Sequence, residues 1–414
     1  MELATLRGFL GIGALLAIAV LFSRKRQAIN LRTVGLAFLL QVALGAFVLY
    51  IPFGKDVLTS ISDGVQQVIN SANVGIAFLF GGLGTDAMFA NGVGFVFAIR
   101  VLPVIIFFSS LIAVLYYLGV MQWVVKIIGG ALQKLLGTSR PESLSATANI
   151  FVGQTEAPLV IRPYIAKMTQ SELFAIMVGG LASVAGSILA GYAGLGIDLK
   201  YLIAASFMAA PGGLLMAKII MPETENDKIA QENLITEDIG EKPSNVIDAA
   251  ASGAASGLKL AVNVGAMLLA FIALIALLNS MVSGTAGLFG IEGVTIEWML
   301  GYLFAPIAYI IGVPSSEMLQ AGSFIGQKIV VNEFFAYVNF VEVKDNLSAS
   351  TQAIITFALC GFANLSSIAI LLGGIGSMAP NRRHDIAKLG MKAMIAATLA
   401  NLMSAAIAGV FLSL

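Results

Sequence analysis

Two carboxylates lie among polar residues in an otherwise apolar chain, and each belongs to a segment of similar design. Glu156 lies in Gly-Gln-Thr-Glu-Ala-Pro at 153–158, and this run precedes Gly-Gly-Leu-Ala-Ser at 179–183. Glu333 precedes Cys-Gly-Phe-Ala-Asn at 360–364. An ionisable group at membrane depth is costly unless it faces protein or a water-filled cavity. Both carboxylates are therefore candidate functional residues, and their recurrence in a repeated unit favours a transporter.

The first unit concentrates hydrogen-bonding side chains in a short, proline-flanked segment. Asn149, Gln154, Thr155 and Glu156 fall close together. Buried polar groups need partners, and a hydrogen-bonding solute can supply them. The alternative is a polar clamp between helices, which normally uses one or two such residues. Gln, Thr and Glu side chains suit the edge of a heterocycle.

The second unit offers a different set of groups. A carboxylate from Glu333, with Asn364 and Ser367, suits the vicinal hydroxyls of a sugar. Phe362 could pack on a ring face, with ordinary core packing as the alternative. Asn364 aligns with Ser183 when the two glycine-containing runs are superposed. Glu333 falls later in its segment than the first carboxylate, so we expect one half to bind ion and base and the other to bind sugar.

An ion site is indicated where the first unit loses helical propensity. Ser183 stands among glycines that would weaken a continuous helix. An unwound turn frees carbonyl oxygens, and oxygen ligands without obligatory charge suit a monovalent cation such as sodium. The candidate ligands are the side chains of Asn149 and Ser183 and the carbonyls of Val152 and Val184. The alternative is that these small residues only allow close helix packing.

Composition places the whole chain in a membrane. Of 414 residues, 58% are hydrophobic and 11% charged, and the mean hydropathy is +0.93, far from the usual soluble composition. The net charge of zero, without basic clusters among aromatics, argues against nucleic-acid binding. Single Cys and His residues exclude an intramolecular disulfide and argue against a His-built metal site.

Eight apolar segments are long enough to cross a membrane, which takes about 20 residues per helix. A basic cluster follows the first segment instead of preceding it, so we interpret that segment as a retained helix and not a signal peptide. The expected spans are 6–22, 33–51, 94–119, 169–192, 199–220, 258–283, 352–376 and 386–413.

Interrupted segments lie between these spans. Residues 120–137 alternate apolar and polar positions at helical spacing, as a helix that lies in the membrane interface does, and residues 298–311 resemble them in placement. The two segments hold Trp123 and Trp298, and tryptophan prefers the interface. After each comes a polar, Pro- or Gly-interrupted stretch, 141–165 and 314–340. We interpret these two stretches as re-entrant hairpins, whose tips must face protein or a water-lined cavity.

The basic residues set the expected orientation. Arg24 to Arg32 lie between the first two spans and Arg382 to Lys388 between the last two, so both loops are assigned to the cytoplasm and both termini to the periplasm. The hairpins then enter from opposite sides. Inverted units with interrupted helices are typical of secondary transporters. The acidic stretch 222–245 is interpreted as a flexible cytoplasmic loop.

Longer motifs carry a family resemblance. They are Gly-Gln-Thr-Glu-Ala-Pro-Leu, Ala-Ala-Ser-Phe-Met-Ala-Ala-Pro-Gly-Gly-Leu at 204–214, the following Pro-Glu-Thr-Glu, and Cys-Gly-Phe-Ala-Asn-Leu-Ser-Ser-Ile. The chain resembles a bacterial sodium-coupled concentrative nucleoside transporter over nearly its whole length. The resemblance implies an all-α inner-membrane protein with eight transmembrane helices, two opposed hairpins, and a homotrimer that works as an elevator.

The resemblance also implies roles for particular residues. The base contacts fall on Gln154, Thr155 and Glu156, with Ile188 as an apolar wall; the ribose contacts fall on Glu333, Asn364 and Ser367, with Phe362 beside the nucleoside; the sodium ligands fall on Asn149, Val152, Ser183 and Val184. The substrates implied are nucleosides of the uridine, cytidine and adenosine class, and sodium is the co-transported ion.

We divide the chain on this basis into N-terminal helices, two inverted units, a linker and a trimerisation helix. The ranges are 1–119 for the N-terminal helices, 120–220 for the first unit, 221–257 for the acidic loop and linker, 258–296 for the trimerisation helix and 297–414 for the second unit.

Three alternative functions are a proton-coupled carrier, an intramembrane enzyme and a channel. A proton-coupled nucleoside carrier would use Glu156 or Glu333 as the proton acceptor. An intramembrane enzyme is disfavoured because no Ser-His, His-Glu-x-x-His or paired metal-ligand motif is present. A channel is disfavoured because opposed hairpins that close over a site suit alternating access.

Overall fold

The computed structural model describes residues 3–84, 96–224 and 243–414, and every regular element in these ranges is a helix. The N-terminal part holds α1 (Leu3–Leu21), α2 (Leu31–Leu49) and α3 (Pro52–Phe80). The sequence analysis gave no separate element to α3, because its polar residues lower its hydropathy below that of a span. Asn30 caps α2 by accepting hydrogen bonds from two backbone N–H groups of its first turn.

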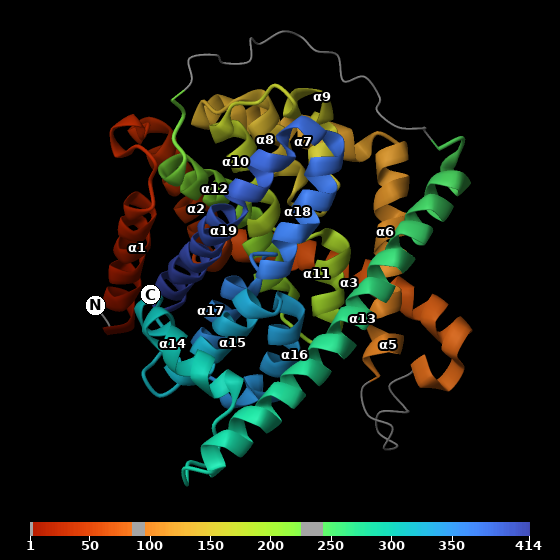
Figure 1. The fold of residues 1–414 in the computed structure, drawn as a ribbon. Helices are drawn as coiled ribbons and strands as arrows, with labels where there is room; N and C mark the ends of the chain where they lie inside the picture. Colours follow the sequence, from red (N-terminus) through yellow and green to blue (C-terminus); the bar gives the residue numbers. More distant parts are fainter. Residues whose placement is uncertain (1–2, 85–95, 225–242) are drawn as a thin grey trace.

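A pair of long helices lies along one flank of the molecule (Figure 1). The short α5 (Phe97–Arg100) leads into α6 (Leu102–Tyr117), which packs along α13 (Val246–Gly287). Gly253 and Gly257 of α13 permit this approach, since an added Cβ would lie 2.6 Å from Ala113 Cβ and 2.7 Å from Ser109 Cβ.

Part of the expected linker, 221–257, is helical, because α13 begins at Val246. Asn245 caps the helix and accepts a hydrogen bond from the Asp248 N–H, which gives a polar segment a helical start that hydropathy does not reveal. Residues 225–242 of the acidic loop lie outside the described residues.

The first unit contains a helix that stops abruptly and a helix that is broken in the middle. Its elements are α7 (Val120–Leu136), α8 (Arg140–Ala148), η4 (Ala157–Ile161), α9 (Arg162–Ile165), α10 (Gln170–Ala182), α11 (Gly186–Gly194) and α12 (Leu199–Ile220). Capping boxes start α8 at Ser139 with Glu142 and α10 at Thr169 with Glu172.

The second unit repeats this order. Its elements are α14 (Ile296–Ile310), α15 (Met318–Val330), α16 (Glu333–Val343), α17 (Ala349–Leu359), α18 (Leu365–Met378) and α19 (Arg383–Leu412). Asn332 caps α16 and Asn364 caps α18. The two units therefore place a break at corresponding points, between α10 and α11 and between α17 and α18.

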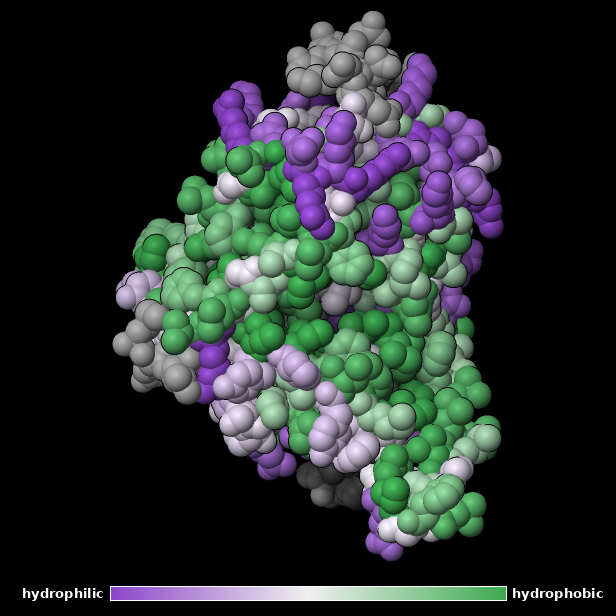
Figure 2. Space-filling view, turned by 60° about the vertical axis from the view of Figure 1, so that its left-hand side comes forward, coloured by the Kyte–Doolittle hydropathy of each residue, from purple (hydrophilic) through white to green (hydrophobic). Residues whose placement is uncertain are grey.

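The apolar helices differ in how far they are buried inside the protein. In the described residues six helices are long and apolar enough to cross a membrane, and the remaining expected spans, 6–22 and 352–376, fall on shorter apolar helices. The apolar stretch is 94% buried in α10–α11 but 17% buried in α13. A broad apolar band is visible below a hydrophilic end (Figure 2). The outer helices thus expose apolar faces that suit lipid or another chain.

Both basic loops lie at one end of the molecule. Arg24 donates a hydrogen bond to the Gln170 side chain, and Arg382 donates to the Met168 carbonyl. The loop between α1 and α2 and the loop between α18 and α19 therefore meet the same short segment. This common end agrees with assigning both loops to one side of a membrane.

Candidate functional site

The two broken helices meet at their breaks. The Phe362 N–H, in the α17–α18 break, donates to the Ser183 carbonyl, in the α10–α11 break, over 3.2 Å. The Gly186 N–H at the start of α11 donates to the Phe151 carbonyl over 3.0 Å, which adds the turn after α8 to the same region. Segments far apart in the sequence therefore converge around non-helical backbone, and the residues singled out by sequence flank it.

The expected ion ligands gather where two helices end. Asn149 caps the C-terminus of α8 and Ser183 that of α10. An added Cβ on Gly179 would lie 3.3 Å from Asn149 Nδ2, so the two helix ends are in contact. Ser183 Oγ donates to the Gly179 carbonyl over 2.9 Å. Helix C-termini carry partial negative charge, which favours a cation there.

In this group, Asn149 has a buried side-chain amide without hydrogen-bond partners. Its side chain is 1% exposed, and neither its Oδ1 nor its Nδ2 has a hydrogen-bond partner in the protein. A buried amide without partners costs about 1–3 kcal/mol. Val152, in the turn after α8, and Val184, in the break after α10, are buried as well. The group offers neutral oxygen atoms that can bind a cation at the negative ends of two helices.

The residues expected to contact a base lie against α18. Gln154 Nε2 donates to Ser367 Oγ over 3.4 Å, and Gln154 Oε1 is buried without a partner. An added Cβ on Gly374 would lie 2.8 Å from Thr155 Cγ2. Ile188 is buried in α11. Glu156 differs from these residues, since its side chain is exposed.

The residues expected to contact a sugar form one hydrogen-bonded cluster. Glu333, the first residue of α16, accepts a hydrogen bond on Oε2 from Asn364 Nδ2 over 2.8 Å. Its Oε1 accepts one from the Tyr192 hydroxyl over 3.0 Å. Asn364 Oδ1 accepts from the Ser367 N–H. Phe362 is half-buried beside them. The carboxylate thus lies where the positive N-termini of α16 and α18 converge.

Three buried residues of this region were missed by the sequence analysis. Tyr192 of α11 is fully buried and holds Glu333, while Lys328 of α15 and Asn401 of α19 are 1% and 2% exposed. A charged Lys328 in an otherwise largely apolar segment is a signal that could have found that residue, whereas Tyr192 carries no such signal. Lys328 Nζ donates to the Ala358 carbonyl and to Asn401 Oδ1, each over 2.8 Å.

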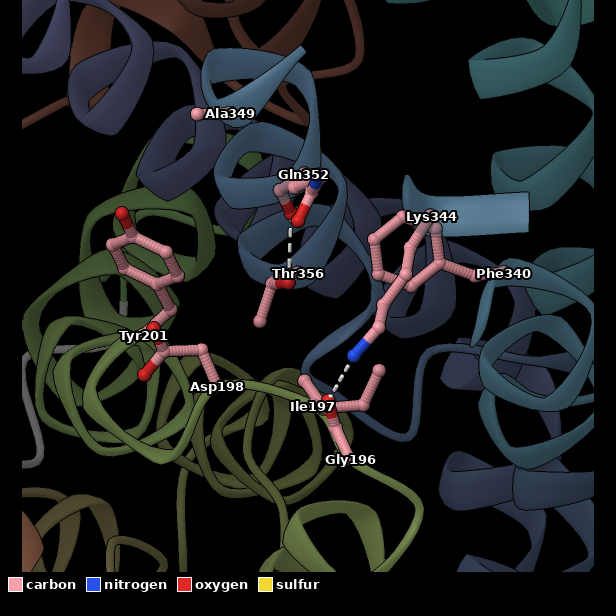
Figure 3. Close-up of a pocket in the computed structure, with 9 residues that line it drawn as sticks. All are labelled: Gly196, Ile197, Asp198, Tyr201, Phe340, Lys344, Ala349, Gln352 and Thr356. Carbon is pink, nitrogen blue, oxygen red and sulfur yellow. Dashed lines mark hydrogen bonds between the residues drawn. The ribbon is translucent and has the colours of Figure 1, made fainter. Parts of the chain in front are cut away.

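A cavity of about 460 Å³ lies elsewhere, between the start of α12 and the α16–α17 corner (Figure 3). Two of its polar side chains bond to the protein itself: Lys344 Nζ donates to the Gly196 carbonyl, and Thr356 Oγ1 donates to the Gln352 carbonyl. None of the predicted site residues lines it; the lining is Gly196, Ile197, Asp198, Tyr201, Phe340, Lys344, Ala349, Gln352 and Thr356. It is not the candidate site.

Replacing Gly361 with alanine tests the close approach of the two breaks. An added Cβ would lie 2.4 Å from Asn401 Oδ1 and 2.7 Å from the Ala182 carbonyl. We expect Gly361→Ala to destabilise the protein by about 1–3 kcal/mol through overpacking. The measurement is the melting temperature in detergent. Gly373→Ala in α18 is the control, because its Cβ would meet open space; equal melting temperatures for both variants would contradict the packing described.

Apolar helices around a buried hydrogen-bonding cluster define a multi-pass membrane transporter. Family models match most of the chain: residues 10–83 match the N-terminus and 201–409 the C-terminus of Na+ dependent nucleoside transporters, and 98–198 match a nucleoside recognition domain. The chain therefore belongs to the Na+ dependent nucleoside transporter family, and it is a transporter and not an enzyme.

Individual relatives agree with this assignment. The nucleoside permease NupC of Helicobacter pylori is 51% identical, covering 100% of this chain and 99% of its own length. Sodium/nucleoside cotransporter 1 of Rattus norvegicus is 38% identical, covering 97% of this chain and 63% of its own length. The structure of CNTnw in an inward-facing substrate-bound state is 60% identical, with TM-score 0.94, covering 99% of this chain and 98% of that chain.

Proposed function

We propose that this protein is a symporter that uses sodium entry to carry nucleosides into the cytoplasm. The observation that carries the proposal is Asn149, whose buried amide lacks a protein partner where α8 and α10 end. In this proposal a sodium ion is the missing partner of Asn149 Oδ1, and none of its protein ligands is a carboxylate. In this proposal Ser183 Oγ and the carbonyls of Val152 and Val184 complete the ion site.

The nucleoside lies between the two units in this proposal. Gln154, Thr155 and Glu156 bind the base against Ile188, and Glu333, Asn364 and Ser367 bind the ribose with Phe362 beside the ring. The Gln154–Ser367 hydrogen bond supports this arrangement, because it joins the proposed base and ribose sides over 3.4 Å. Long, weak hydrogen bonds of this kind are readily exchanged for bonds to a solute.

The membrane arrangement follows from the basic end of the molecule. We assign that end to the cytoplasm and both termini to the periplasm of a bacterial inner membrane, with eight spans. The α8–α9 segment and the α15–α16 pair are then opposed re-entrant hairpins of an inverted repeat. The contact between the two breaks supports a site at the repeat interface.

An elevator movement in a homotrimer is the proposed mechanism. The exposed apolar surface of α13 supports its use as a trimerisation scaffold with α6. Gly191 of α11 faces Val101 and Ile105 beside this scaffold, and its added Cβ would be at ordinary contact distances of 3.4 and 3.6 Å. A small, apolar surface of this kind lets the core slide without breaking hydrogen bonds.

Uptake into proteoliposomes tests the proposal. We expect radiolabelled uridine to enter quickly under an inward sodium gradient and slowly when choline replaces sodium. Uptake that follows an inward proton gradient and ignores sodium would contradict sodium coupling, and it would favour the proton-coupled alternative with Glu156 or Glu333 as proton acceptor.

A further inference from the structure

One buried side-chain amide bonds to both helix breaks. Asn401 Nδ2 of α19 donates to the Ala182 carbonyl over 2.7 Å and to the Cys360 carbonyl over 3.0 Å. Ala182 ends α10, and Cys360 follows the last residue of α17. Both N–H groups of one amide are thus used on the unpaired C-terminal carbonyls of two different broken helices.

The orientation of this amide is fixed by a buried lysine. Lys328 Nζ lies 2.8 Å from Asn401 Oδ1, and an ammonium group can only donate, so the amide atom facing it must be the oxygen. Lys328 also donates to the Ala358 carbonyl in the last turn of α17, where a positive charge complements the helix end.

The connection runs between the two halves of the proposed site. Ala182 directly precedes Ser183, an expected ion ligand, and Cys360 lies within the break that leads to Asn364. Gly361 leaves no room for a side chain between them, since its added Cβ would lie 2.7 Å from the Ala182 carbonyl. A movement of one break relative to the other would therefore change the hydrogen bonds that Asn401 makes.

We propose that Asn401, oriented by Lys328, is the positioning residue that couples sodium affinity to nucleoside affinity. This inference rests on the sodium–nucleoside symport proposed above. Ordering of the ion half by sodium orders the sugar half through the shared amide. Coupling between two sites is reciprocal, so each ligand must raise the affinity for the other by the same factor.

The test compares uridine binding with and without sodium. For the wild-type protein, we expect the Kd for radiolabelled uridine in choline to exceed that in sodium. Asn401→Asp keeps the size of the side chain and the Lys328 contact but has no N–H for the two carbonyls. We expect this variant to reduce the Kd ratio about fivefold or more. The half-saturating sodium concentration, measured with and without uridine, must change its ratio by the same factor.

Two further variants make the test specific. Lys328→Met keeps the amide but removes the group that orients it, and we expect the Kd ratio to fall in the same direction. Thr398→Val is the control on α19, because the Thr398 hydroxyl bonds within its own helix to the Met394 carbonyl; the wild-type ratio is expected here.

The possible failures can be distinguished. A wild-type ratio retained in Asn401→Asp overturns the role of Asn401 while leaving symport intact. A ratio near one in the wild-type protein overturns both this inference and the proposed sodium coupling. A merely structural role for Asn401 would lower the melting temperature and leave the two reciprocal ratios unchanged, which also overturns the inference.

Discussion

Replacing Glu333 with glutamine is expected to lower uridine uptake at subsaturating concentration by about 30-fold, or about 2 kcal/mol. The carboxylate accepts hydrogen bonds from Tyr192 and Asn364 at the N-termini of α16 and α18. A glutamine amide would turn one acceptor into a donor, which would face another donor at Asn364 or weaken the bond to Tyr192. It would also lose the charge-assisted bonds expected to the ribose hydroxyls.

The measurement is the initial rate of radiolabelled uridine uptake, with the elution volume in gel filtration as a check of assembly. Glu342→Gln is the matched control, because Glu342 lies exposed on the same helix and has the same chemistry. We expect normal uptake by the control. Normal uptake by Glu333→Gln would remove Glu333 from the proposed ribose site.

Replacing Asn149 with alanine is expected to raise the sodium concentration for half-maximal uptake by about tenfold, or about 1.4 kcal/mol. The Asn149 side chain has no protein partner, so its removal takes a ligand from the ion and breaks no side-chain hydrogen bond within the protein. The maximal rate at saturating sodium is expected to change less than the sodium dependence.

Thr147→Val in α8 is the control for this variant. The Thr147 hydroxyl bonds within its own helix to the Ser143 carbonyl, so its loss perturbs the last turn of α8 and leaves the Asn149 side chain in place. An unchanged sodium dependence in Asn149→Ala would exclude this side chain from the ion site. A similar shift in both variants would indicate a general effect on α8.

Local sequence signals were enough to locate the breaks and the residues beside them. The glycines around Ser183, and Gly361 in the second unit, lower helix propensity. Polar side chains in apolar runs are costly unless they have hydrogen-bonding partners or a function. The structure places both breaks in contact and joins Glu333 to Asn364, two residues that the sequence assigned to the same half of the site. The all-helical fold and the family were likewise predictable, because composition and long motifs determine them.

Contacts between distant segments were not predictable from those signals. Lys328 and Asn401 are 73 positions apart, and their bond depends on how α15 packs against α19. Tyr192 looks like an ordinary aromatic residue of an apolar helix until α11 is placed beside α16. The start of α13 was missed for a different reason, since a capped polar turn has no hydropathy signal.

The two carboxylates that share a sequence context also differ in their surroundings. Glu333 is buried and bonded on both oxygens, whereas the Glu156 side chain is exposed. A fixed carboxylate suits the ribose hydroxyls that nucleosides have in common, and an accessible one suits bases of different shape. This difference supports the separate roles proposed for the two units.

Reverse coupling tests the central claim most directly. Proteoliposomes are prepared with equal sodium concentrations on both sides, and an inward gradient of uridine is imposed while the entry of radiolabelled sodium is followed. If the protein is an obligate sodium:nucleoside symporter, uridine entry must carry labelled sodium inward, and Asn149→Ala must reduce this flux at limiting sodium. Uridine that equilibrates without any net movement of sodium would contradict the account.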